Sequence, residues 1–102
     1  MPEQVVDNPS AQIITEPTLK TNLETKYHSM VDHYGVTLWR VGGQNPSPHL
    51  KQELKRMWSG GKRGGRPRPE KLKRLGVSQE DIDDIIQQDK AIREIMLEID
   101  KL

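Results

Sequence analysis

The last quarter of the chain carries the pattern that most constrains its fold. After Ser78, apolar side chains recur every three or four residues, with an interruption at Asp89. They are Ile82, Ile85, Ile86, Ile92, Ile95, Met96, Ile99 and Leu102. Such spacing places side chains on one face of an α-helix, and Ser78 with Asp81 three residues later supplies a capping-box start. The sequence therefore predicts a helical C-terminal region over 70–102 that contains a long amphipathic helix.

This predicted helix has two alternative partners. Only 32% of the 102 residues are hydrophobic and Phe is absent, so the rest of the chain offers little apolar surface to cover a helix of this length. In one alternative, a second copy or another protein covers the stripe, with Asp89 setting the register. The residues expected to bind that partner are Ile82, Ile85, Ile86, Ile92, Ile95, Met96 and Ile99. In the other, the stripe packs against a helix of the same chain.

The first 58 residues predict an arm followed by a small helical region. Residues 1–17 contain three prolines and no sustained period, which favours a flexible or extended arm. From Thr18 to Tyr34 the apolar spacing is helical, and Gly35 is a typical helix end. Residues 36–41 are rich in strand formers and predict one short strand, and a second helix is expected from Pro48 or His49 to Trp58. The expected fold class is mainly α.

The net charge of +1 conceals a strong segregation along the chain. Residues 51–75 hold ten Lys and Arg against two Glu, whereas residues 76–102 hold three basic and eight acidic residues. Within the basic stretch, residues 59–69 mix charge with Gly and Pro and predict a basic loop without regular structure. Such a concentration of charge is typical of segments that contact phosphates. We therefore expect contacts with nucleic acid from Lys55, Arg56, Lys62, Arg63, Arg66, Arg68, Lys71, Lys73 and Arg74.

Two short resemblances bear on the kind of nucleic acid. The run Gly65-Arg66-Pro67-Arg68-Pro69 resembles the core of an AT-hook, which implies Arg side chains along a narrow minor groove, although Gly64 stands where the hook has Arg. Arg63-Gly64-Gly65 is equally similar to an RGG element, which implies RNA or single strands. DNA and RNA therefore both stay open. Trp58 is placed to stack on a base, but a Trp on an amphipathic helix is more often core.

Two other interpretations compete with nucleic-acid binding. The basic block is also what a solvated linker looks like, one that balances the acidic end of the chain. A protein-interaction or assembly factor, such as a structural subunit or an inhibitor of a larger complex, would use the arm and the long helix for docking and would have no direct nucleic-acid role. Leu72 to Ser78 also resembles the turn of a helix-turn-helix, but the helix after it begins with acidic residues that phosphates would repel.

The remaining sequence features argue against an enzyme. No Walker-type loop, nucleophile elbow or dinucleotide fingerprint is present, and the chain has no Cys. Glu24, His28 and Asp32 share a helical spacing that suits a metal or an acid-base pair, but the same spacing describes a solvent-facing helix surface. We expect a non-enzymatic protein without cofactor or metal. The absence of an apolar run or signal-like start favours a cytoplasmic location without membrane contact.

Overall fold

The computed structural model of the chain describes residues 16–45, 47–58 and 64–102. These residues form four helices: α1 (Glu16–Gln44), α2 (Pro48–Trp58), α3 (Pro69–Arg74) and α4 (Gln79–Asp100). The described part of the chain contains no strand, so the prediction of a mainly α protein is confirmed. The predicted arm lies outside the described residues up to residue 15, and its last two residues belong to α1.

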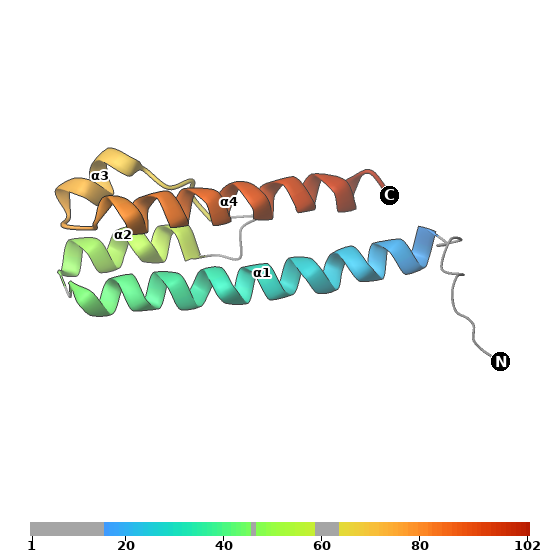
Figure 1. The fold of residues 1–102 in the computed structure, drawn as a ribbon, viewed down its shortest axis with the longest axis horizontal. Helices are drawn as coiled ribbons and strands as arrows, with labels where there is room; N and C mark the ends of the chain where they lie inside the picture. The colour runs from blue at the N-terminus through green and yellow to red at the C-terminus, as the bar shows by residue number, and fades with distance from the viewer. Residues whose placement is uncertain (1–15, 46, 59–63) are drawn as a thin grey trace.

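The two long helices set the shape of the molecule. α1 and α4 lie side by side and run in opposite directions along its long axis (Figure 1). α2 packs against α1 and α3 packs against α4. As a result, α1 begins and α4 ends at one end of the molecule, and α2 and α3 lie at the other (Figure 1).

The core is small and lies mainly where the helices overlap. All four helices contribute to it, and Val77 adds a side chain from the turn before α4. Its most deeply buried large side chains are Tyr34, Leu38, Leu50, Met57, Leu72, Ile82, Ile85 and Ile92. The apolar face of α4 is thus largely covered by other parts of the same chain. The intramolecular alternative for this helix accounts for most of its stripe.

The predicted strand over 36–41 is wrong, and so is the predicted helix end at Gly35. Both segments belong to α1, which continues to Gln44. Tyr34, Leu38 and Val41 are spaced by four and three residues and are all buried, so packing against the other helices overrides the strand preference of the local residues. Gly35 serves close packing instead, because a Cβ there would lie 3.1 Å from the Trp58 ring.

The other three helices follow the predicted start and stop signals. α2 begins at Pro48 and ends at Trp58. Ser78 caps α4, and its Oγ accepts a hydrogen bond from the Asp81 backbone N–H at 3.2 Å. The Asp81 carboxylate forms an ion pair with Arg40 of α1 at 3.0 Å, which helps to align the two long helices. Residues 64–68 join α3 without forming helix or strand.

Gly76 gives a first testable prediction. Its φ of +94° suits Gly, and a Cβ would lie 2.3 Å from Asn45 Nδ2, which donates to the Leu75 carbonyl at 2.8 Å. Gly76→Ala should therefore lower the free energy of unfolding by about 1–3 kcal/mol, measured by urea denaturation. Gly43→Ala is the control, because Gly43 lies in α1 with open space around it and Ala favours a helix by up to about 1 kcal/mol. Equal effects of the two substitutions would contradict the strain at Gly76.

Candidate nucleic-acid interface

A buried carboxylate organises the basic residues around α2. Glu53 is only 2% exposed, yet it lies on the same helix as the exposed Lys51 and Lys55 and the half-buried Arg56. Its oxygens accept hydrogen bonds from Arg68 Nε at 3.0 Å and from Arg56 Nη2 at 2.8 Å, and Lys71 Nζ lies 3.6 Å away. Cations from α2, α3 and the segment between them therefore converge on one anion.

A second buried carboxylate holds the same segment against α4. Asp89 accepts hydrogen bonds from Arg66 Nε at 3.0 Å and from Arg93 Nε at 3.1 Å. Arg93 Nη2 also donates to the Gly64 carbonyl at 2.9 Å, and Arg56 Nη2 donates to the Arg66 carbonyl at 2.6 Å. The two carboxylates thus hold residues 64–68, the segment before α3, against both α2 and α4. Such pairing gives residues 64–68 a defined path despite their Gly and Pro content.

The pKa values show how firmly these charges are set. Hydrogen bonds from Arg68, and then from Arg56, lower the pKa of Glu53 to about 2, although burial alone would raise it. The same contact raises the pKa of Arg68. Both groups are therefore charged at neutral pH. Burial, and to a smaller extent the charge of Asp89, raise the pKa of the Tyr34 phenol.

The surface left by this arrangement is positive. Five cationic side chains surround two carboxylates, which leaves an excess of three positive charges. The carboxylates are buried, but the side chains of Arg66 and Arg68 are 68% and 49% exposed. Arg66 pairs with Asp89 through its Nε, so its two outer nitrogens take no part in that hydrogen bond.

The predicted phosphate-contacting residues fall into three groups. Arg56, Arg66, Arg68 and Lys71 are brought together by the buried carboxylates. Lys55 on α2 and Lys73 and Arg74 on α3 are exposed. Lys62 and Arg63 lie outside the described residues. The structure therefore brings four of the nine residues into one cluster and places three others on the helices that carry it.

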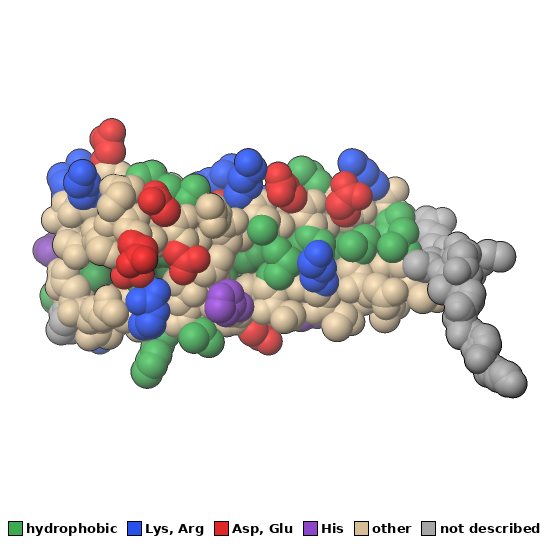
Figure 2. Space-filling view, viewed as in Figure 1, with side chains coloured by type: hydrophobic (Ala, Val, Ile, Leu, Met, Phe, Trp, Pro, Cys, Tyr) green, Lys and Arg blue, Asp and Glu red, His purple; other side chains and the backbone are tan. Residues whose placement is uncertain are grey.

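The predicted partner-binding residues of α4 are mostly covered by the chain itself. Ile82, Ile85, Ile92 and Ile95 are buried within the chain, and Ile86, Met96 and Ile99 are half-buried. Figure 2 shows hydrophobic side chains along the seam between α1 and α4 toward the end where α1 begins. A shallow groove of about 630 Å³ lies on this seam. Its apolar lining is Leu23, Met30, Ala91, Ile95 and Leu97.

The roles of four residues could not be predicted from the sequence. Asp89 interrupts the apolar stripe and Glu53 is one of two Glu in the basic stretch, but in the structure each is a buried anchor for Arg. The signal was a carboxylate at a position where the helical period demands an apolar residue. Trp39 was assigned to a strand, but it is 77% exposed on α1. Trp58 was expected to pack in the core more often than to stack on a base, but it is 50% exposed.

The described part of the chain contains neither a group of residues that could hold a metal ion nor a helix that could span a membrane. Glu24, His28 and Asp32 are exposed on α1, and no group of His, Cys, Asp or Glu among residues 16–45, 47–58 and 64–102 is arranged to hold a metal ion. Across the same residues, no helix is both long and apolar enough to cross a membrane.

Comparison with known proteins returned no match to any protein-family model, any curated protein or any solved structure. Function must therefore be inferred from the charge and geometry of the described residues.

Proposed function

We propose that this chain is a small accessory protein that binds the phosphate backbone of nucleic acid through the surface formed by α2, residues 64–68 and α3. The observation that carries the proposal is the convergence of Arg56, Arg68 and Lys71 on the single buried carboxylate of Glu53. Neutralising one carboxylate requires one cation, so the arrangement holds more positive charge than stability of the fold explains.

The ion pairs favour binding because they hold the cations in place beforehand. A free Arg side chain loses about 1.5–2 kcal/mol of rotamer entropy when it is fixed. Arg68 and Arg56 already lose this freedom in the folded protein, where Glu53 accepts their hydrogen bonds. Guanidinium groups match the geometry of phosphate oxygens. Arg68 donates to Glu53 through both Nε and Nη2, so its Nη1 and the outer nitrogens of Arg66 are the ones left for a phosphate.

The pairing also favours phosphates over the minor groove as the contact. The resemblance to an AT-hook implies that Arg66 and Arg68 extend freely into a groove. In the folded chain, their Nε atoms donate instead to Asp89 and Glu53. Insertion would break both ion pairs and leave two buried carboxylates without partners, which is costly. Arg68 Nη2 also donates to Glu53, but phosphate contacts by Arg68 Nη1 and by the outer nitrogens of Arg66 require no such rearrangement.

The proposal predicts salt-dependent binding that depends on α3. Lys73→Ala with Arg74→Ala should weaken binding about tenfold near 0.1 M salt and reduce the slope of log affinity against log salt by about 2, because two phosphate contacts are lost. Fluorescence anisotropy with labelled duplex DNA, single-stranded DNA and RNA measures both quantities. Lys20→Ala with Lys26→Ala is the matched control, since it removes the same charge from exposed sites on the first turns of α1.

A protein-interaction or assembly role is the second candidate, and the seam between α1 and α4 favours it. The groove there combines apolar residues with two Lys and two Glu, a pattern that a second copy could complement with the same residues. These are Lys26, Lys101, Glu94 and Glu98. If no nucleic acid binds at low salt while sedimentation shows a dimer, this second function replaces the first. A protein that does both would show each behaviour separately.

A further inference from the structure

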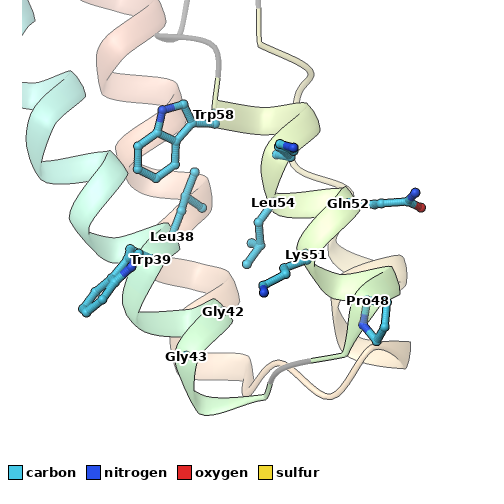
Figure 3. Close-up of a pocket in the computed structure, with 10 residues that line it drawn as sticks. Leu38, Trp39, Gly42, Gly43, Pro48, Lys51, Gln52, Leu54 and Trp58 are labelled. Atoms are coloured by element: carbon cyan, nitrogen blue, oxygen red, sulfur yellow. The ribbon is translucent and has the colours of Figure 1, made fainter.

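An exposed apolar groove lies between α1 and α2, on the flank of α2 opposite the Glu53 cluster. It encloses about 800 Å³, and Leu38 and Leu54 form its floor (Figure 3). Trp39 and Trp58 line it from α1 and from the end of α2. A second hollow of about 440 Å³ adjoins it, and the same two Trp line that hollow as well. Exposed apolar surface of this kind usually marks a binding site.

Trp58 is held as a flat platform. Three carbon atoms of its six-membered ring lie between 3.1 and 3.6 Å from the position that a Cβ on Gly35 would occupy. One face of the ring therefore rests on α1 at Gly35, where a Cβ would make a tight contact with the ring. The side chain is nevertheless 50% exposed, so the opposite face is open to a ligand. A ring that is fixed in advance loses little entropy when another ring stacks on it.

Trp39 provides a second aromatic surface next to the first. It is 77% exposed, and no other ring packs against it among the described residues. Val36, one turn earlier on α1, is 62% exposed and shares the adjoining hollow. The two Trp of the chain therefore line one hollow together.

The charge along the larger groove is positive, whereas Asp32 lines the adjoining hollow. Lys51 and Lys55 lie one turn apart on α2, both are exposed, and both line the groove (Figure 3 labels Lys51). Gln52 lines this groove and also the hollow on the other flank of α2, where Arg56, Arg68 and Lys71 gather. The aromatic groove and the cation cluster therefore lie on two sides of one helix, and a single extended strand can contact both.

We propose that unpaired bases stack on Trp39 and Trp58, so that the nucleic acid preferred by this protein is single-stranded. The inference rests on the proposed function, because the cation cluster supplies the contacts to phosphate. Aromatic platforms beside Lys and Arg are how proteins bind single strands with little sequence preference. In a duplex the base faces are stacked on each other, so they cannot reach the indoles. The positive rim suits phosphates and disfavours a basic peptide as the occupant.

The test compares one single strand with one duplex on the full chain. Fluorescein-labelled (dT) of about 20 nucleotides and a duplex of about 20 base pairs are titrated by anisotropy, and Trp emission is followed with unlabelled strands. We expect the single strand to bind more tightly and to quench Trp emission, and Trp39→Ala to weaken it about 10- to 100-fold. Duplex affinity should change less than about twofold. Trp39→Phe should restore most of the affinity, because Phe keeps an aromatic face.

Leu19→Ala is the control for loss of apolar surface without loss of an aromatic face, because Leu19 is exposed on α1 and lines neither hollow. It should leave the affinity for (dT) unchanged if stacking is the interaction. If the single strand and the duplex bind equally and Trp39→Ala alters neither, the stacking site is overturned while the phosphate-binding function stands, and the groove is left to an apolar protein segment. If the wild-type chain binds neither nucleic acid at low salt, both proposals fail.

Discussion

Replacing Glu53 by Gln is expected to lower the free energy of unfolding by about 2–4 kcal/mol. The substitution keeps the size of the side chain but removes a carboxylate that accepts hydrogen bonds from Arg56 and Arg68 and lies near Lys71. Three cations would then face one another without an anion between them. Their partial exposure moderates the repulsion, so the loss stays below that of a fully buried charge cluster. Urea denaturation at neutral pH measures the effect.

The pH dependence provides an internal check on the same carboxylate. The pKa of Glu53 is about 2 in the folded chain and 4.5 ordinarily, so its stabilisation is complete above pH 4.5 and is lost as pH falls toward 2. The loss is on the order of 3 kcal/mol for wild type. Glu53→Gln should lack this part of the acid sensitivity. Glu70→Gln removes the same charge from an exposed site on α3 and should leave both stability and acid sensitivity close to wild type.

Ile92→Ala is the second substitution with a large expected effect, a loss of about 2–5 kcal/mol. Ile92 is completely buried in the core of the single chain, so the substitution removes packed methyl groups and leaves a cavity. The midpoint of thermal unfolding should fall without depending on protein concentration. Leu97→Ala is the control on the same helix, because Leu97 is 59% exposed and should change stability by less than about 0.5 kcal/mol.

The concentration dependence decides what covers the stripe of α4. If Ile92 lay between two subunits, dilution would lower the unfolding midpoint of the wild type, and Ile92→Ala would shift the monomer–dimer equilibrium. A midpoint that rises with concentration, together with a mild effect of Ile92→Ala, would contradict the intramolecular packing described for α4.

The helices at the C-terminal end could be predicted because local signals and packing agree there. Ser78 is a good cap, Gly76 suits the turn, and the isoleucines of α4 keep one period over the whole helix. Each feature acts within a few residues of the chain. Prediction from sequence succeeds under this condition, because no distant contact has to be known.

The second half of α1 could not be predicted because its local and distant preferences conflict. Gly35 and the β-branched residues that follow it favour a break and a strand. Burial of Leu38 and Val41, and the close approach of Leu54 to Gly42 and of Trp58 to Gly35, stabilise the helix instead. These contacts join residues that are far apart in the sequence, so no window around Gly35 contains the deciding information.

The sequence indicated which basic residues the candidate site contains, but not the ion pairs that hold them together. The charge pattern located the basic residues on α2, α3 and the segment between them. It gave no sign that Glu53 and Asp89 would be buried among them, because ion pairs such as Arg66 with Asp89 connect residues 23 positions apart. The aromatic groove was missed for the same reason, since Trp39 and Trp58 meet only after α2 folds back on α1.

The antiparallel pairing of α1 and α4 separates two ends of the molecule by a rigid spacer. α1 alone is about 43 Å long at 1.5 Å per residue, and α2 and α3 lie at the end where it finishes. Trp39 lies 23 residues from the start of α1, about 35 Å along the helix, whereas Asp89, which holds Arg66, lies 11 residues from the end of α4, about 17 Å. A fluorophore attached where α1 begins would therefore report on one end of the molecule without touching the Trp groove at the other.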